Sequence, residues 1–196
     1  QEILAQYSGW GGLSDAFEPN KDSWHSEYTE LKSLLTEEEY AAARSSTLTA
    51  FYTPPEVIDA MYTTLRKMGV GAGTILEPSM GAGAFFGQSH SYLYEPTTRL
   101  FGVELDSLTG RIARQLYQKA NIQITGFEKA DLPDSFFDVV IGNVPFGDYS
   151  VVDPQYNRLH FKIHDYFFAK SIDKLRTGGI IAFITTSGTL DKKSEE

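Results

Sequence analysis

The chain has 196 residues, of which 41% are hydrophobic and 22% are charged, and it contains no cysteine. This length and composition predict one sizeable domain with a real core. The lack of cysteine excludes disulfides and thiolate metal sites, and it fits a reducing compartment. No apolar stretch approaches the roughly 18 residues of a membrane span, and no signal-peptide pattern begins the chain, so we expect a cytoplasmic protein.

The net charge of −9 bears on the choice of partner. Proteins that hold a polyanion such as DNA depend on Lys and Arg contacts to phosphate. Here the 17 basic residues are spread thinly, and no Lys/Arg-rich run occurs. If the chain acts on nucleic acid, we expect most of the grip to come from another region or another chain.

The first 50 residues predict a helical and irregular segment. Glycines surround Trp10 in the sequence SGWGGLSDAF, which covers residues 8–17. Thr36 and Glu39 form a capping-box pattern that opens a helix.

Short apolar segments that alternate with helical stretches begin at residue 74, after a helix that the prolines at 54 and 55 introduce. Expected strands cover residues 74–78, 99–105, 121–127, 137–143 and 178–186, and expected helices cover 107–120 and 164–176. Continuous apolar strands joined by helices predict an α/β fold, with a parallel sheet covered on both faces. In such sheets ligands bind beyond the carboxyl ends of the strands. The residues at the strand ends are therefore the candidates for a site.

The first strand runs into LEPSMGAGAFFG, in which Gly81 and Gly83 allow a tight turn and a close approach of the backbone to a ligand. A dinucleotide fingerprint has its third glycine one residue earlier than Gly87. Glu77, just before the turn, suits a ligand that carries a positive charge better than it suits a pyrophosphate. The alternative is a plain glycine-rich turn.

Acidic residues also follow the second and third strands. Glu104 falls 21 positions after the second of these glycines, where an acid accepts hydrogen bonds from ribose hydroxyls of an adenosine ligand. Asp106 is its rival, although it is better placed to cap the next helix. Phe127 offers an apolar wall, and Glu128 offers an acceptor for an adenine amino group. Asp131 is an alternative acceptor, and a solvated surface role remains open for both acids.

The fourth strand ends in VVIGNVPFG, residues 139–147. This pattern places the carboxamide of Asn143, a backbone carbonyl and the ring of Phe146 at the tip of a buried strand. These groups can hold a planar amino group and its ring. In isolation such a tetrapeptide is more often a simple turn.

The order FYTPPEV, LEPSMGAG, GVELD, GFE, IGNVPF and FFAKSIDKLRTGGIIAFI resembles the S-adenosylmethionine-dependent adenine-specific DNA methyltransferases whose cofactor motifs precede the catalytic tetrapeptide. The likeness covers about residues 49–190, and the SGWGGL and IHDYFFAKS segments also look like methylase domains fused to helicases in phages and mobile elements. The resemblance implies a Rossmann-like, doubly wound, mostly parallel sheet of the class I methyltransferase type. Residues 51–196 would form the catalytic domain, after an N-terminal helical segment of residues 1–50.

The resemblance also implies residue roles around S-adenosylmethionine. Residues expected to border its methionine part are Phe51, Tyr52, Thr53, Pro54, Glu77, Pro78, Ser79, Gly81 and Gly83. Glu104, with Leu105 beside it, would bind the ribose, and Phe127 with Glu128 would hold the adenine. The base to be methylated would contact Asn143, Val144, Pro145 and Phe146.

One position departs from the family pattern of Asn or Asp, Pro, Pro and an aromatic residue, because Val144 stands where the first Pro is expected. Val144 keeps the backbone carbonyl but loses the fixed φ of proline, so we expect a less rigid loop. No metal is required by this chemistry, and the four histidines are too scattered for a metal site. For His164, a place at a helix start is favoured over a catalytic role.

Other substrates and roles stay open. The same logic serves enzymes that methylate a protein glutamine amide or an RNA base, and a non-catalytic module of a restriction or helicase assembly is a further alternative. A nucleotide-binding oxidoreductase is disfavoured by the late third glycine. We expect the C-terminal hairpin and the target-recognition domain of this family to lie outside this chain, and a fused or associated helicase is possible. The chain alone is therefore expected to methylate DNA weakly or not at all.

Overall fold

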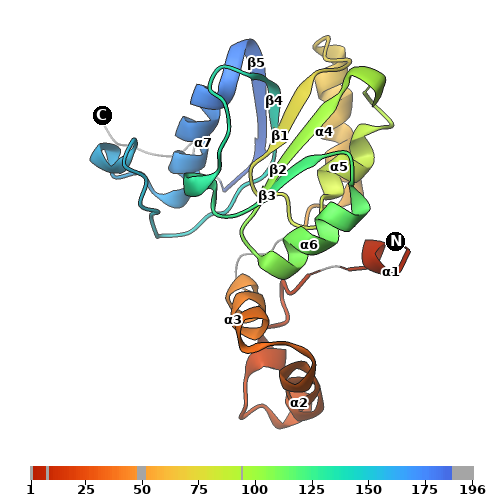
Figure 1. Cartoon of the computed structure of the whole chain (residues 1–196), viewed down its shortest axis with the longest axis vertical. Coiled ribbons are helices and arrows are strands. Elements are labelled where there is room, and N and C mark those ends of the chain that lie inside the picture. The colour runs from red at the N-terminus through yellow and green to blue at the C-terminus, as the bar shows by residue number, and fades with distance from the viewer. Residues whose placement is uncertain (1, 8, 48–51, 94, 187–196) are drawn as a thin grey trace.

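A computed structural model of the chain describes residues 2–7, 9–47, 52–93 and 95–186. In these residues a central sheet carries helices on both faces, and a helical segment precedes it (Figure 1). The helices are α1 (Glu2–Ala5), α2 (His25–Leu34), α3 (Glu37–Ser46), α4 (Pro55–Lys67), α5 (Ala84–Ser89), α6 (Ser107–Leu116) and α7 (Ile163–Lys174). The strands are β1 (Thr74–Glu77), β2 (Arg99–Glu104), β3 (Asn121–Ile124), β4 (Phe137–Asn143) and β5 (Leu175–Ile184).

The strand order within the described residues is β3-β2-β1-β4-β5, and all four pairings are parallel. The chain moves outward from β1 through β2 to β3, and then returns to place β4 on the other side of β1. Ligands bind at such a switch point, beyond the carboxyl ends of the two strands that flank it. The fold prediction is confirmed, and the topology brings the end of β1, at Glu77, next to the end of β4, at Asn143.

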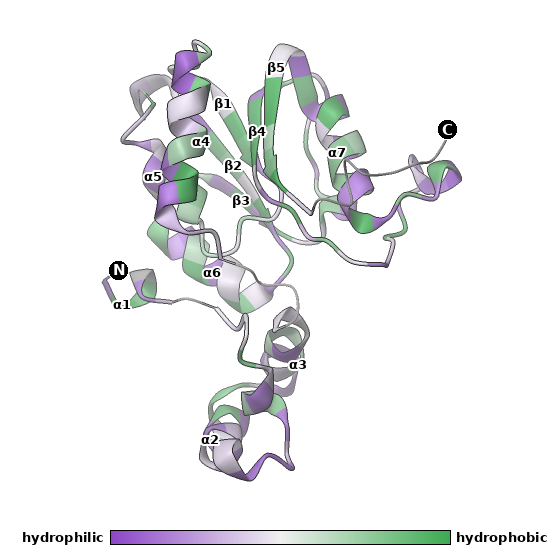
Figure 2. Ribbon diagram, turned by 180° about the vertical axis from the view of Figure 1, so that it is seen from behind, coloured by the Kyte–Doolittle hydropathy of each residue, from purple (hydrophilic) through white to green (hydrophobic). Residues whose placement is uncertain are grey.

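The two faces of the sheet explain why the strands read as continuous apolar runs. In β4, Val139 and Ile141 pack toward α4 and α5, where Tyr62 of α4 is fully buried. Val140 points to the opposite face and packs in the core that includes Phe167 of α7. Strand β4 and the second half of β5, residues 180–184, are accordingly largely hydrophobic (Figure 2). Burial on both faces removes the alternation that a half-exposed strand would show.

The N-terminal helical segment has a small core of its own. Phe17 and Tyr40 are buried there, with ring centroids 5.2 Å apart, and Trp10 packs against Phe17. The predicted capping box is confirmed, because Thr36 and Glu39 exchange hydrogen bonds between side chain and backbone at the start of α3. The expected boundary between residues 50 and 51 lies outside the described residues.

Three predicted element boundaries differ from the structure by three or more residues. Strand β5 begins at Leu175 because Leu175 pairs with Phe137, and a bulge then separates this pair from the pair of Val139 and Ile180. Gly178, with φ +79°, supplies the backbone conformation of the bulge. Strand β3 ends at Ile124 and gives way to a 3₁₀ turn, η4 (Phe127–Lys129). Helix α6 ends at Leu116, where the next residue turns its ring toward α5.

Candidate functional site

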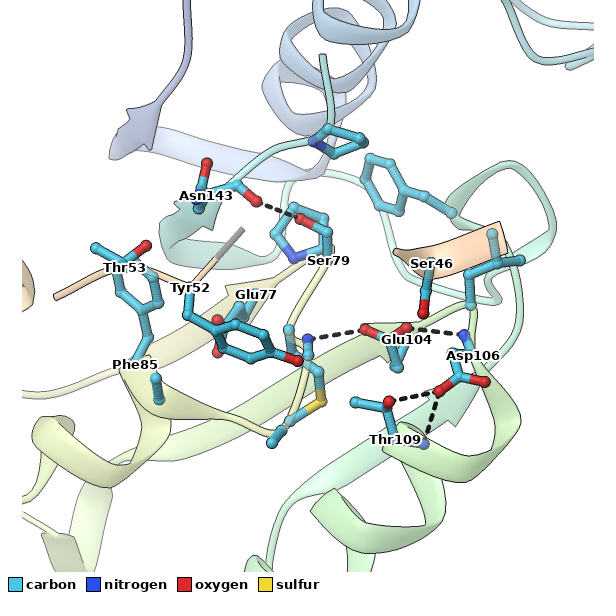
Figure 3. Close-up of a pocket in the computed structure, with 18 of the residues that line it drawn as sticks. Ser46, Tyr52, Thr53, Glu77, Ser79, Phe85, Glu104, Asp106, Thr109 and Asn143 are labelled. Atoms are coloured by element: carbon cyan, nitrogen blue, oxygen red, sulfur yellow. Dashed lines mark hydrogen bonds between the residues drawn. The ribbon is translucent and has the colours of Figure 1, made fainter. Parts of the chain in front are cut away.

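A cavity of about 620 Å³ lies at the carboxyl ends of β1, β2 and β4. Its volume falls within the range of roughly 300 to 1,000 Å³ that is usual for cofactor pockets. Side chains from three strand ends and from the segment before α4 surround it (Figure 3). In that view Asn143 and Thr53 lie toward one end of the cavity, while Glu104 and Asp106 lie toward the other.

Most of the predicted site residues line this one cavity. They are Tyr52, Thr53, Glu77, Pro78, Ser79, Gly81, Glu104, Leu105, Phe127, Asn143 and Pro145. The cavity lining does not include Pro54, Gly83, Glu128, Val144 or Phe146. Phe51 lies outside the described residues.

The glycine loop after β1 is fixed by the acid at the end of β2. Gly81 has φ +55°, and its N–H donates to Oε2 of Glu104 at 2.8 Å. Gly83, with φ +89°, caps α5. A Cβ at Gly83 would lie 2.4 Å from the ring of Tyr117. Of these two glycines, Gly81 borders the cavity and Gly83 does not; Gly83 is needed because the ring of Tyr117 packs against the loop.

Glu104 is held in place by two backbone groups. Its Oε1 accepts a hydrogen bond from the N–H of Asp106 at 2.8 Å, and its Oε2 accepts the bond from Gly81. Burial raises the pKa of Glu104, and the two N–H donors oppose this rise. An oriented carboxylate with free lone pairs at the cavity wall is suited to accept hydrogen bonds from ribose hydroxyls.

Glu77 is the most deeply buried acid of the cavity, with 1% of its surface exposed. Its Oε2 has no hydrogen-bond partner among the described residues. Burial raises the pKa of Glu77 well above its usual value, and the charge of Glu104 raises it further. An unsatisfied carboxyl oxygen at this depth is costly unless a ligand satisfies it. A ligand with an ammonium group could donate a hydrogen bond to this oxygen, and a sulfonium group nearby would favour the charged carboxylate. Both groups fit S-adenosylmethionine.

Asp106 caps α6, as predicted. Its carboxylate accepts hydrogen bonds from the N–H groups of Leu108 and Thr109, and the hydroxyl of Thr109 donates to the same carboxylate. The carboxylate oxygens of Asp106 therefore already accept hydrogen bonds from the start of α6, which leaves Glu104 as the better acceptor for ribose hydroxyls.

The tetrapeptide after β4 is anchored on both sides. The carbonyl of Asn143 accepts a hydrogen bond from the hydroxyl of Ser79 at 2.9 Å, which connects it to the glycine loop (Figure 3). The N–H of Val144 donates to the carbonyl of Ile184 in β5 at 3.2 Å, and the side chain of Val144 is 1% exposed. A proline at this position could not donate that bond. The loop that was expected to be less rigid is thus fastened to β5.

The wall around Phe127 is supported from α7. Phe127 packs against Phe167, with ring centroids 4.9 Å apart, and lies 5.3 Å from the ammonium of Lys170. The buried Lys170 donates to the carbonyl of Glu128 at 3.2 Å and to Oδ2 of Asp153 at 2.9 Å. This ammonium therefore joins the turn of Glu128 to the segment that follows the tetrapeptide.

The two candidate adenine acceptors are both outside the cavity lining. The carboxylate of Glu128 folds over Gly126, which does line the cavity. Asp131 is exposed, and Gln123 of β3 holds its backbone through two hydrogen bonds. Glu128 is therefore the nearer candidate.

Asp153 is charged in this network in spite of its burial. Burial works against its charge, but the hydroxyl of Tyr166, at 2.7 Å, and the ammonium of Lys170 outweigh that effect and lower its pKa. The ion pair is thus supported by hydrogen bonds on both partners, which is the condition under which a buried pair is stable.

Sequence reasoning missed several cavity residues. Tyr7 and Ser46 come from the N-terminal segment, Tyr117 follows α6, and Tyr149 follows the tetrapeptide. The SGWGGL segment, which directly follows Tyr7, indicated that this part of the chain belongs to the fold. Nothing in its sequence indicated that Tyr7 lies at the cavity. Tyr149 stands three positions after Phe146 and is 44% exposed, and it brings an aromatic ring to the cavity beside Asn143 and Pro145.

Other types of site find no support in the part of the chain that the structure covers. No group of three or more His, Asp or Glu residues is placed to hold a metal ion there. His164 lies in the first turn of α7 and does not line the cavity, which agrees with a helix-start position. None of the described helices is both long enough and apolar enough to cross a membrane.

The fold is of the class I methyltransferase type. Among solved structures, the chain is similar to a type I restriction-modification methyltransferase subunit from Streptococcus thermophilus, with a TM-score of 0.58 and 19% identity, over 88% of this chain and 44% of that one. It is also similar to an S-adenosylmethionine-dependent O-methyltransferase from Thermotoga maritima, with a TM-score of 0.51 and 13% identity, over 71% and 47% of the two chains. At these identities the likeness concerns the fold.

The sequence defines the family more narrowly. Residues 34–196 match the model of the N-6 DNA methylase family, and the chain belongs to that family. It is also 30% identical over 139 residues to the "Defense against restriction protein B" of Escherichia phage P1. That match covers 68% of this chain but only 6% of the phage protein, so the chain spans a small part of that relative.

Proposed function

We propose that this chain binds S-adenosylmethionine and transfers its methyl group to the exocyclic amino group of adenine in DNA. The observation that carries the proposal is the shared cavity at the switch point of the sheet, where Glu77 and Glu104 stand at two strand ends and Asn143 at a third. A ligand that bridges these ends would place a positive charge near Glu77 and a ribose near Glu104. Its reactive end would then face Asn143.

The cofactor supplies an electrophilic methyl group on a sulfonium. The residues of the chain supply position and polarity. The carboxamide oxygen of Asn143 and the carbonyl of Val144 would each accept one hydrogen of the target amino group, which frees its lone pair for in-line attack. The N–CH3 bond would form as the S–CH3 bond breaks, S-adenosylhomocysteine would leave, and the extra proton on nitrogen would pass to solvent. No strong base is needed before transfer, so Asn at position 143 is sufficient.

The aromatic residues of the target side would hold a base that has left the duplex. Phe146 is the stacking partner expected from the family tetrapeptide, and it is partly buried. Tyr149 is the more exposed ring, and it lines the cavity together with Pro145. We assign Tyr149 as a second aromatic contact for the base, since stacking between rings is the usual means of holding a flipped base.

Cofactor binding is the first test. Calorimetric titration with S-adenosylmethionine should give binding to the wild-type chain and much weaker binding to Glu104→Ala, while NAD gives no heat. Binding of NAD in place of S-adenosylmethionine would overturn the proposal and favour a nucleotide-binding oxidoreductase instead.

Substrate choice is the second test. The chain is incubated at high concentration with methyl-labelled S-adenosylmethionine and, separately, with unmethylated DNA, RNA and a glutamine-containing peptide. Digestion and mass spectrometry should find N6-methyladenine from DNA, in the wild type and not in Asn143→Ala. Label in RNA or peptide alone would contradict the DNA assignment. Because this chain alone is expected to transfer weakly, cofactor binding with no transfer to any substrate would favour a non-catalytic module only if a longer chain that carries the target-recognition region is equally inactive.

A further inference from the structure

We propose that residues 2–7, here called the N-terminal strap, complete the wall of the cofactor cavity, and that Tyr7 is a cofactor-binding residue. Glu2, Leu4 and Tyr7 line the same cavity as Glu104. The strap precedes the nearest predicted cofactor residues by more than forty positions in the sequence, and α1 (Glu2–Ala5) lies beside α6 (Figure 1). The inference rests on the proposed function in one respect, the identity of the cofactor.

A chain of hydrogen bonds connects the strap to the ribose acid. The hydroxyl of Tyr7 lies 3.0 Å from Oγ1 of Thr109. Because the hydroxyl of Thr109 already donates to the carboxylate of Asp106, Tyr7 must be the donor in its own bond. The N–H of Asp106 in turn donates to Glu104 at 2.8 Å. The position of Tyr7 is therefore coupled to the residue that is expected to bind ribose.

Two glycines of the SGWGGL segment, which follows the strap, have a positive φ, and one of them leaves room for a side chain of the cavity. Gly9 has φ +70°, and a Cβ at this position would lie 1.4 Å from the hydroxyl oxygen of Tyr52. Tyr52 therefore occupies the space that a side chain at position 9 would need. Gly12 has a similar φ of +77°, yet a Cβ there would meet no atom within 4 Å. The two glycines share a backbone conformation, but only Gly9 makes room for a cavity residue.

Trp10 connects the strap to the small core of the N-terminal segment. Its ring lies 6.3 Å from that of Tyr7 and 5.5 Å from that of Phe17, edge to face in both cases. The segment is in turn fixed to the sheet domain, because Arg111 of α6 forms an ion pair with Glu39 of α3. The C-terminal end of the strap is thus held against a segment that is itself attached to the sheet domain.

The chemistry of the strap fits an adenosine ligand. Tyr7 and Tyr52 bring two aromatic rings to the side of the cavity where Glu104 stands, and both lie close enough to feel its charge. Burial raises the pKa of both phenols, so both remain neutral at physiological pH. The hydroxyl of Tyr7 donates to Thr109, so Tyr7 offers its ring to the ligand, whereas Tyr52 offers a ring and a hydroxyl donor. Aromatic walls with a few placed donors are typical of nucleoside pockets. A bound ligand would lie against the strap, and it would leave more slowly than from an open cavity.

The chain carries a built-in probe for the test. It has two tryptophans, Trp10 and Trp24, and both pack in the N-terminal segment. Intrinsic tryptophan fluorescence therefore reports on this segment. In a Trp24→Phe background, titration with S-adenosylmethionine should change the emission of Trp10, and stopped-flow displacement with S-adenosylhomocysteine gives the rate of release.

Variants of the strap decide the outcome. Tyr7→Phe, which removes one hydrogen bond, should weaken binding by about three- to tenfold, mainly through faster release. Gly9→Ala should weaken it further, because Tyr52 must move. Gly12→Ala is the matched control, with similar backbone strain and open space, and it should keep the wild-type affinity. Circular dichroism and thermal unfolding verify that each variant folds.

Two results would overturn the inference. If Tyr7→Phe and Gly9→Ala bind S-adenosylmethionine with the affinity and release rate of the wild type, the strap is not part of the site, and the proposed function stands without it. If the wild-type chain does not bind S-adenosylmethionine at all, the proposed function fails and this inference fails with it.

Discussion

The cavity has two halves that are built in different ways. The cofactor half, at the ends of β1 and β2, consists of the fully buried Glu77, the half-buried Glu104 and a glycine loop, and backbone hydrogen bonds hold Glu104 and the loop in place. The target half begins at Asn143 and continues through exposed residues 147–150, where Tyr149 is 44% exposed. We expect the cofactor half to be preorganised and the target half to gain its final order from the substrate. Binding of the cofactor and transfer of the methyl group should therefore be separable.

The largest expected effect is a loss of methyl transfer without a loss of cofactor binding, which tests whether the two halves act independently. Asn143→Ala removes an acceptor for the target amino group, and it should lower methyl transfer by at least about 100-fold. Because Glu77 and Glu104 are unchanged, calorimetry should find the wild-type affinity for S-adenosylmethionine. A variant that loses cofactor binding as well would mean that the halves are not independent.

The buried ion pair between the halves has the next largest effect. Lys170→Met leaves the carboxylate of Asp153 buried without its partner, which should lower the free energy of unfolding by about 3 kcal/mol. Urea unfolding measures this change. The matched control is Lys162→Met, because Lys162 pairs with Asp148 at 2.8 Å in an exposed setting. That variant should unfold close to the wild type, and equal destabilisation by both would disprove the role of burial.

Glu104 tests the cofactor half alone. Glu104→Ala removes the ribose acceptor and the carboxylate that holds Gly81, so the affinity for S-adenosylmethionine should fall by about 10- to 100-fold. Glu104→Gln keeps an oxygen acceptor and the shape of the side chain, and it should lose less. Isothermal titration of both variants gives the comparison. Equal affinities for the wild type and Glu104→Ala would place the ribose elsewhere.

The smallest effect is a dependence of binding on pH. The pKa of Glu77 is raised in the free protein, and a cationic ligand favours the carboxylate. Binding should therefore release a proton below that pKa, and affinity should rise with pH by less than about tenfold per pH unit until the carboxyl is ionised. Calorimetry in buffers of different ionisation enthalpy detects the proton. In Glu77→Gln the slope should flatten, and an unchanged slope would assign it to Glu104.

The fold and much of the site could be predicted because local signals repeat along the chain. Glu77, Glu104 and Asn143 each stand where an apolar strand ends, and a parallel sheet brings such ends together whatever lies between them. The capping box at Thr36 was likewise a local pattern. Predictions of this type need only the spacing of apolar residues along the sequence and the residue types at the end of a strand or at the start of a helix.

The rest of the site depends on contacts between distant residues. Nothing near Tyr7 in the sequence indicates its bond to Thr109, and nothing near Lys170 indicates that it pairs with Asp153. Gly83 shows the same limit, because the ring of Tyr117 fills the space beside it in addition to the positive φ that the loop requires. A pattern can indicate that a glycine is needed, but only the packing shows which neighbour requires it.

The hydrogen bond from Val144 to Ile184 has a consequence for how the target loop keeps its shape. Two successive prolines would stiffen the loop from within, since each ring restricts its own backbone. Here the loop is held by a hydrogen bond to β5, the neighbouring strand, so its rigidity depends on the pairing between β4 and β5. The geometry at Asn143 is therefore a property of the sheet, and a substitution in β5 that weakens its pairing with β4 should shift the carboxamide of Asn143.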